Sequence, residues 1–127
     1  MSEFEKIALV GCGYWGKNLC RNFNDLGALG HVVDSTDAGK AKALELAPDV
    51  PVSSSLENVL QDETIKAVAL ATPAETHAEI AILAMKEGKD VFVEKPMSLS
   101  LEDAQKMRKT AENEGRILMV GHLLEYH

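Results

Sequence analysis

A glycine-rich turn between an apolar strand and a helix constrains this sequence more than any other feature. The apolar run Lys6 to Gly11 ends on the first of three glycines, Gly11, Gly13 and Gly16, which have the spacing G-x-G-x-x-G. In a strand–turn–helix unit, the first glycine allows a tight turn, the second lets a diphosphate approach the backbone, and the third lets the helix pack near the sheet. The amides at the helix N-terminus then face the anion. The alternative is a tight turn that binds no ligand.

An acidic residue at the end of the next predicted strand favours a dinucleotide as the ligand. Asp34 ends the run at residues 31–34 and lies 18 positions after Gly16, close to the spacing of about 20 at which a carboxylate receives the ribose diol. A carboxylate repels the 2′-phosphate of NADP, so the sequence favours NAD, although Ser35 and Thr36 could donate hydrogen bonds to a phosphate. The alternative for Asp34 is a solvated strand-end carboxylate or a helix cap.

Short apolar runs alternate with segments of helical period along the chain. Further strands are predicted at Lys66 to Thr72, Asp90 to Glu94 and Ile117 to Gly121. The first of these is nearly all apolar, as expected for a strand covered on both faces. Strands separated by helices imply right-handed crossovers. We therefore predict an α/β fold with a Rossmann-like, doubly wound, mostly parallel sheet of six strands and helices on both faces.

Helices are expected between these strands, each with one apolar stripe facing the sheet. The inward residues that this spacing predicts are Trp15, Leu19, Phe23 and Leu26, then Ala41, Leu44 and Ala47, and finally Leu101, Ala104, Met107 and Ala111. Capping residues and breakers mark the helix ends. They predict a helix after the N-cap Asp37 and before Pro48, then Leu56 to Gln61 after Ser55, Thr76 to Glu87 before Gly88, and Leu101 to Glu114 between Ser100 and Gly115.

Composition limits the classes of function. A chain of 127 residues that is 46% apolar can bury one core, so we predict one domain over residues 1–127. Its net charge of −7 argues against binding nucleic acid, which needs clustered Lys and Arg. No apolar stretch approaches the roughly 18 to 20 residues that cross a bilayer, and the acidic start, Met1 to Lys6, is unlike a signal peptide. We expect a cytoplasmic protein that binds a small molecule and no membrane.

The two cysteines, Cys12 and Cys20, lie eight residues apart without the paired spacing of a zinc site. Two cysteines are also too few for a disulfide framework. We interpret both as reduced packing residues and predict no metal site.

Two polar loops follow predicted strands in the second half, Thr72-Pro73 and Glu94-Lys95-Pro96. Because ligands of open parallel sheets bind outside the carboxyl ends of the strands, both loops should border one crevice. We predict that Lys95 stands beside the cofactor and hydrogen-bonds a substrate hydroxyl, where its charge stabilises the negative charge that develops as hydride leaves carbon. Without this context, Lys95 would be an exposed lysine closing a strand.

Together these motifs resemble the nucleotide-binding half of the glucose–fructose oxidoreductase, inositol dehydrogenase and MocA family. The resemblance covers essentially all 127 residues in order. Within the family, Tyr14 to Asn18 and the ending His122 to His127 look most like 3-dehydrogenases that oxidise UDP-linked N-acetylated hexosamines or hexosaminuronates. The residues that carry the resemblance are Gly11 to Gly16, Asp34, Ala71-Thr72-Pro73, Thr76-His77, Glu94-Lys95-Pro96 and Gly121-His122.

The resemblance implies an NAD cofactor and roles for individual residues. Lys95 would be the active-site lysine, Glu94 would contact the nicotinamide-side ribose, and His122 would either approach the nicotinamide or anchor a loop. Thr76 and His77 would shape a loop, and His77 receives no catalytic role. The residues that the resemblance implies in cofactor binding are Gly11, Gly13, Tyr14, Trp15, Gly16, Asp34, Thr72, Pro73, Glu94, Lys95 and His122.

Members of this family continue with a substrate domain that supplies a second catalytic side chain, whereas this chain stops at His127. We therefore expect a cofactor domain that binds NAD but oxidises little or no sugar by itself, and that is homo-oligomeric in complete form. Two alternatives stay open: a non-catalytic nucleotide-binding or redox-sensing module, and a dehydrogenase acting on a free polyol such as an inositol.

Overall fold

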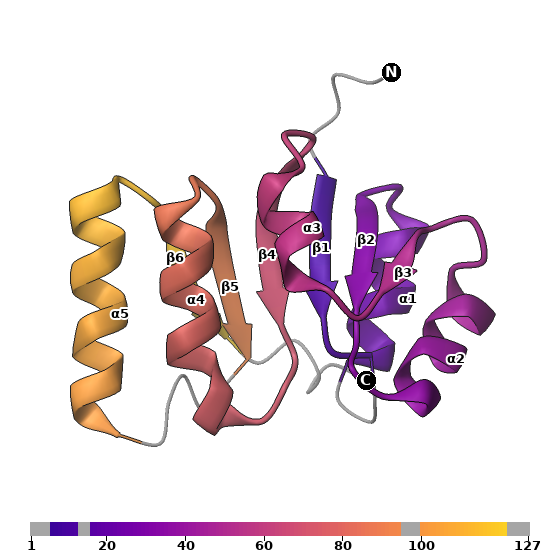
Figure 1. Cartoon of the computed structure of the whole chain (residues 1–127), viewed down its shortest axis with the longest axis horizontal. Coiled ribbons are helices and arrows are strands. Elements are labelled where there is room, and N and C mark those ends of the chain that lie inside the picture. Colours follow the sequence, from indigo (N-terminus) through magenta and orange to yellow (C-terminus); the bar gives the residue numbers. More distant parts are fainter. Residues whose placement is uncertain (1–5, 13–15, 95–99, 122–127) are drawn as a thin grey trace.

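A computed structural model describes residues 6–12, 16–94 and 100–121 of the chain (Figure 1). In this part, six parallel strands form one sheet in the order β3-β2-β1-β4-β5-β6. The predicted Rossmann-like α/β fold is confirmed. The strands are β1 (Lys6–Val10), β2 (Leu29–Val33), β3 (Val52–Ser53), β4 (Ile65–Leu70), β5 (Asp90–Glu94) and β6 (Leu118–Gly121).

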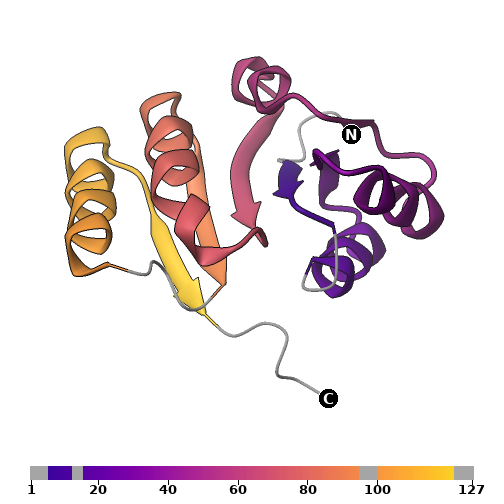
Figure 2. The same ribbon diagram turned by 60° about the horizontal axis from the view of Figure 1, so that its bottom comes forward.

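The helices lie on both faces of the sheet (Figure 2). Residues alternate along β1, so that Ala8 and Val10 join the core under α3, α4 and α5, while Leu9 joins the core under α1 and α2. The helical segments are α1 (Lys17–Asp25), α2 (Asp37–Leu46), α3 (Leu56–Gln61), the 3₁₀ turn η1 (Ala74–Thr76), α4 (His77–Lys86) and α5 (Leu101–Glu114).

The predicted inward face of α2 is confirmed at Ala47 and wrong at Ala41 and Leu44. Ala41 and Leu44 are exposed, Leu44 by 54% of its surface, whereas Gly39, Ala43 and Ala47 are buried. Two of the buried positions, Ala43 and Ala47, join the core with small side chains that let the helix approach the sheet closely. The stripe therefore repeats every four residues from Gly39.

Two other leucines expected in the core lie on the surface. Leu26 is the C-cap residue after α1 and is 78% exposed, and Leu101, the first residue of α5, is 72% exposed. Both stand at helix ends, where the first or last turn extends beyond the packed face. Leu19, Met107 and Ala111 are buried as predicted. Trp15 lies outside the described residues.

The caps agree with the predictions for α5 but not for α2. Ser100 accepts a hydrogen bond from Asp103 N–H at 2.9 Å, and Gly115 ends α5 in the left-handed conformation. At α2 the N-cap is Thr36, whose Oγ1 accepts from Gly39 N–H at 3.0 Å, and Asp37 is the first helical residue. Ser55 is the N-cap of α3 without a side-chain hydrogen bond.

One part of the sheet is covered on a single face. Helices α4 and α5 pack on β4–β6, and in Figure 2 no described helix lies over the other face of β6, drawn in yellow. On that face Phe92 is partly buried, and Ile117 and Met119 are 61% and 57% exposed. Parallel sheets are normally covered on both sides, so Ile117 and Met119 mark an apolar face of the sheet that no described helix covers.

No helix of the described segments is long and apolar enough to cross a membrane.

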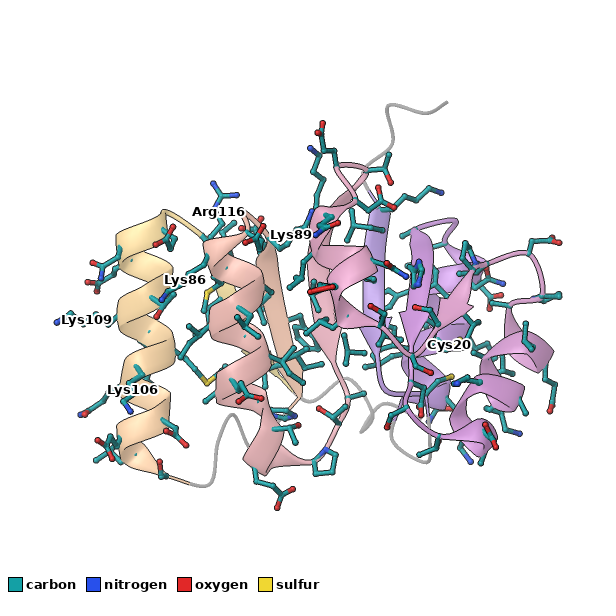
Figure 3. All side chains as sticks on the ribbon, viewed as in Figure 1. Cys20, Lys86, Lys89, Lys106, Lys109 and Arg116 are labelled. Atoms are coloured by element: carbon teal, nitrogen blue, oxygen red, sulfur yellow. The ribbon has the colours of Figure 1, made fainter. Side chains whose placement is uncertain are left out.

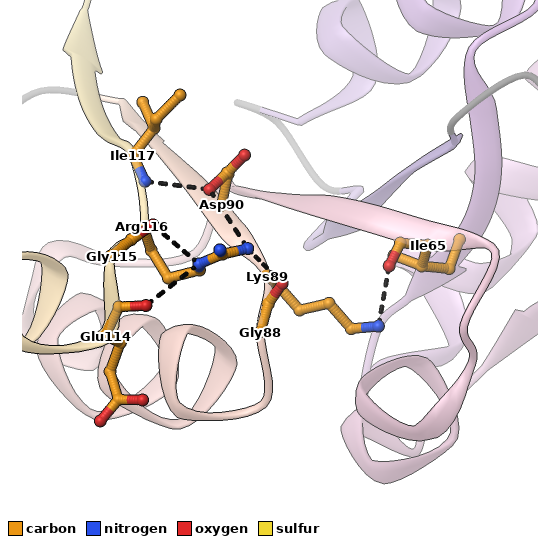
Figure 4. Close-up of polar contacts among 8 residues, drawn as sticks. All are labelled: Ile65, Gly88, Lys89, Asp90, Glu114, Gly115, Arg116 and Ile117. Carbon is orange, nitrogen blue, oxygen red and sulfur yellow. Dashed lines mark hydrogen bonds and ion pairs between the residues drawn. The ribbon is translucent and has the colours of Figure 1, made fainter.

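Polar contacts tie together the amino ends of β4, β5 and β6 (Figure 4). Asp90 accepts a hydrogen bond from Ile117 N–H at 2.9 Å, and Arg116 donates to the Gly88 carbonyl at 2.9 Å. Lys89 is only 5% exposed and donates to the carbonyls of Asp62, at 2.8 Å, and Ile65, at 2.7 Å. This edge of the sheet is thus a structural clamp, opposite the carboxyl ends of the strands.

Lys89 should contribute strongly to stability. We expect Lys89→Met to lower the free energy of unfolding by about 3 kcal/mol, because two hydrogen bonds from a charged donor are lost and two carbonyls lose their partner. Urea denaturation measures the change. Lys86 lies nearby on the exposed face of α4 (Figure 3), so Lys86→Met is the control and should change stability by less than about 0.5 kcal/mol. If the two variants have the same free energy of unfolding, the Lys89 hydrogen bonds do not stabilise this edge of the sheet.

Candidate functional site

A cleft of ≈ 490 Å³ opens at the carboxyl ends of β1, β2 and β4. The sheet order reverses at this place: β2 and β4 flank β1, and the chain winds away from it in both directions. Open α/β sheets bind ligands at such a switch point. The lining residues are Val10, Gly11, Val33, Asp34, Ser35, Thr36, Ser54, Leu56, Ala71, Thr72, Pro73, Thr76 and Ile80.

The glycine-rich turn has the predicted context, since it leads from β1 into α1. Gly11 has a φ of +96°, which favours glycine, and its N–H donates to the Val33 carbonyl at 2.7 Å. Gly16 has an ordinary φ of −85°, but a Cβ there would overlap the Gly11 carbonyl oxygen. Gly16 is therefore required for space, and Gly11 for conformation. Gly13, Tyr14 and Trp15 lie outside the described residues.

Asp34 lies directly after β2 on the wall of the same cleft. Its Oδ2 accepts a hydrogen bond from Cys12 N–H at 2.8 Å. Its Oδ1 accepts from the N–H and the hydroxyl of Thr36, at 2.8 and 2.7 Å. A carboxylate has about four acceptor positions, so three bonds leave room for a hydroxyl donor. The glycine turn and the acid predicted 18 positions after it are thus brought together.

The surroundings of Asp34 keep it ionised. Partial burial by itself raises the pKa of Asp34, but the hydrogen bonds from Cys12 and Thr36, together with the positive charge of Lys40, outweigh it and hold the pKa below its ordinary value. Asp34 therefore presents a fixed negative charge that accepts hydroxyl donors and repels a phosphate placed directly beside it. The residues present fit the ribose and diphosphate of a dinucleotide.

The loop after β4 is held by its own side chains. Thr72 and Thr76 share a hydrogen bond between their hydroxyls at 2.7 Å, and the Thr76 hydroxyl donates to the Pro73 carbonyl at 2.7 Å. His77 is buried, and its Nε2 lies 2.7 Å from the Thr72 carbonyl oxygen, which accepts the hydrogen bond. These contacts fix Thr72 and Pro73 on the cleft wall. His77 contributes by its hydrogen bond to the Thr72 carbonyl, which holds the loop in place.

The remaining predicted site residues are placed only in part. Glu94 ends β5 and pairs with Gly121 of β6, so both strands end at the edge of the sheet that carries the cleft. The side chain of Glu94, and the whole of Lys95 and His122, lie outside the described residues.

Three contributors to the site were not predicted. They are the Cys12 amide and Thr36, which donate hydrogen bonds to Asp34, and Gly39, which packs against the Asp34 carboxylate. Only Gly39 had a signal in the sequence, because glycine inside a predicted helix is disfavoured and calls for a reason.

The two cysteines are free and buried, as interpreted from the sequence. The neighbouring Cys20 thiol, burial and the charge of Asp34 raise the pKa of the Cys12 thiol, so Cys12 stays protonated and unreactive. Among residues 6–12, 16–94 and 100–121, no three His, Cys, Asp or Glu side chains are arranged to hold a metal ion.

The fold and the cleft together define a dinucleotide-binding domain. The model of the family GFO_IDH_MocA, described as "Oxidoreductase family, NAD-binding Rossmann fold", matches residues 5–122. The chain belongs to this family, and it is an NAD-binding Rossmann domain of the oxidoreductase type.

Relatives of different activities share this domain. The chain is 37% identical over 120 residues to 2,7-anhydro-N-acetylneuraminate hydratase of Mediterraneibacter gnavus, covering 94% of this chain and 32% of the relative. It is 31% identical over 129 residues to scyllo-inositol 2-dehydrogenase (NAD(+)) of Bacillus subtilis, covering 99% and 38%. The chain thus spans about a third of the length of these relatives.

A solved structure with both cofactor and sugar bound also matches. It is the WlbA dehydrogenase from Chromobacterium violaceum in complex with NADH and UDP-GlcNAcA, with 28% identity and a TM-score of 0.84 over 95% of this chain and 36% of that one. The likeness supports the family and the fold, while the relatives differ in what they act on.

Proposed function

We propose that this chain is the cofactor half of a dehydrogenase that moves hydride between a sugar and NAD. The observation that carries the proposal is the joining of the glycine turn to Asp34 in one cleft by the Cys12 N–H bond of 2.8 Å. As the sugar we propose a UDP-linked N-acetylated hexosamine or hexosaminuronate that reacts at C3. The complex of the WlbA dehydrogenase with NADH and UDP-GlcNAcA supports this choice.

Each part of the cleft has a role in the proposal. The turn from Gly11 to Gly16 receives the diphosphate, Asp34 receives the ribose diol and disfavours NADP, and Thr72 and Pro73 line the path toward the nicotinamide. When bound, the nicotinamide accepts the hydride. Lys95 hydrogen-bonds the reacting hydroxyl and helps to remove its proton.

A free polyol is the second candidate substrate. Inositol dehydrogenases of Bacillus subtilis and Paracoccus denitrificans are among the relatives, at 31% and 27% identity. The same cofactor half serves either reaction, so the choice depends on substrate contacts made elsewhere. Assaying UDP-sugars against inositols, in the protein extended to the length of its relatives, separates the two.

Asp34→Asn tests the cofactor site. We expect it to weaken NAD binding by about 10- to 100-fold and to reduce the preference over NADP, because the negative charge that accepts the diol is lost. Isothermal calorimetry with both cofactors measures this.

In the unchanged protein, NAD affinity should stay constant from about pH 8 to pH 5, since the pKa of Asp34 lies below its ordinary value. It should fall only as the pH drops through that lowered pKa, where Asp34 becomes protonated.

Asp49→Asn removes a carboxylate from an exposed position outside the cleft lining and serves as the control. An unchanged chain that binds neither NAD nor NADH would refute the proposed site. An Asp34→Asn variant with full affinity and unchanged preference would refute the role of the carboxylate.

A further inference from the structure

We infer that Gly39 determines the cofactor preference, as a positioning residue whose missing side chain leaves the space in which the Asp34 carboxylate is held. This inference rests on the proposed role of Asp34 in receiving the ribose. It assigns a function to a residue in the first turn of α2, a position outside the glycine-rich motif and outside the lining of the cleft.

The carboxylate of Asp34 lies directly against the Cα of Gly39. A Cβ at Gly39 would overlap three atoms, and all three belong to the carboxyl group of Asp34: Oδ2, Cγ and Oδ1. Gly39 itself is buried. The carboxylate cannot move aside without losing contacts, because it accepts three hydrogen bonds from Cys12 and Thr36.

Backbone conformation gives no reason for a glycine here. In the part of the chain that the structure describes, the glycines with positive φ are Gly11, Gly27, Gly88 and Gly115, and Gly39 is not one of them. Within a helix, alanine is preferred to glycine. The same helix carries alanines at the exposed positions Ala38 and Ala41. Space for the carboxylate is the remaining requirement that the structure shows.

Gly39 is also connected to Asp34 through Thr36. The Gly39 N–H donates to Thr36 Oγ1 at 3.0 Å, and the Thr36 hydroxyl donates to Asp34 Oδ1 at 2.7 Å. The other carboxylate oxygen accepts from Cys12 N–H in the glycine turn. The first turn of α2, the acid and the turn therefore form one hydrogen-bonded unit, and a side chain at Gly39 would separate its parts.

The consequence differs for the two cofactors. A displaced carboxylate no longer meets the ribose diol, so NAD binding weakens. The same displacement removes negative charge from the place where a 2′-phosphate would lie, next to the exposed Ser35 and Thr36. NADP binding therefore weakens less, or improves, and the ratio of the two dissociation constants moves toward one.

Gly39→Ala in the full chain is the test, with calorimetry for NAD and for NADP. We expect the ratio of the NADP to the NAD dissociation constant to fall at least about tenfold, with a cooperative thermal transition retained. Ala41→Ser adds one heavy atom to the exposed side of the same helix and should leave the ratio unchanged. If Gly39→Ala does not fold, Thr36→Val removes the hydroxyl that donates to Asp34 Oδ1 and should weaken NAD binding. The NAD dissociation constant is the measurement for this variant, because Thr36 could also donate to a 2′-phosphate.

A double variant shows whether Gly39 acts through the carboxylate. In an Asp34→Ala background there is no carboxylate to displace. The double variant Asp34→Ala/Gly39→Ala should therefore have the same ratio of dissociation constants as the Asp34→Ala single variant. A further fall in the double variant would overturn the inference. So would an unchanged ratio in Gly39→Ala or, where that variant does not fold, an unchanged NAD dissociation constant in Thr36→Val. An unchanged chain that binds neither cofactor would refute the proposed function, whereas an NAD preference that survives Gly39→Ala would refute the inference alone.

Discussion

Gly16→Ala should weaken NAD binding by more than about 100-fold, equivalent to about 2.7 kcal/mol. The backbone of Gly16 has φ −85° and ψ −17°, which alanine adopts without strain. The added methyl group, however, would overlap the carbonyl oxygen of Gly11. Both partners of this clash are backbone atoms, so α1 must move away from β1, and the amides that face the diphosphate move with it. Calorimetry with NAD measures the loss.

Gly88→Ala is the matched control, because it has the opposite properties. Gly88 has a φ of +85°, and an added Cβ would meet nothing within 4 Å. Its replacement should cost about 1 to 2 kcal/mol of stability through backbone strain and leave NAD affinity unchanged. Normal NAD binding by Gly16→Ala would show that the turn accommodates a side chain, and would contradict its proposed place at the diphosphate.

The strands and the last helix could be predicted because each depends on a local pattern. The apolar run before Glu94 and the segment between Ser100 and Gly115 carry their boundaries in consecutive residues, and the observed β5 and α5 have the predicted ends. The sequence predicts a sheet of six strands but locates only five of them. The sixth, the two-residue β3, could not be located this way, since it exists only by pairing with β2. The inward face of α2 was predicted correctly at Ala47 but missed at Gly39 and Ala43 for a related reason: these buried positions are small residues, and a hydrophobic pattern weights them least.

The candidate site likewise has one part that a local sequence pattern predicts and another part that only the folded chain shows. Gly11, Gly16 and Asp34 occupy a spacing that a dinucleotide imposes on the sequence. The structure places Gly11 and Asp34 on the wall of one cleft and packs Gly16 against the Gly11 carbonyl. The contacts that hold Asp34 come from a backbone amide, a hydroxyl and a missing side chain. Almost any residue can supply a backbone N–H, so its use at Cys12 leaves no mark in the sequence. Such contacts are found only once the chain has folded.

Lys95→Ala should separate an enzyme from a module that only binds nucleotide. We expect the rate of hydride transfer to fall by about 1,000-fold, within the 10²- to 10⁴-fold range of a positioned acid–base group. The dissociation constant of NAD should change by less than about threefold, because the glycine turn and Asp34 are intact. The measurement is the formation of reduced nicotinamide in the protein extended to the length of its relatives, with calorimetry for NAD. Unchanged hydride transfer would contradict the proposed role of Lys95.

Lys95→Arg then distinguishes two ways in which the lysine could act. Arginine keeps the positive charge but stays protonated in proteins, because its pKa exceeds about 12. If the charge alone stabilises the developing alkoxide, the Lys95→Arg variant should recover part of the lost rate. If the side chain must take the hydroxyl proton, the Lys95→Arg variant should be as slow as Lys95→Ala.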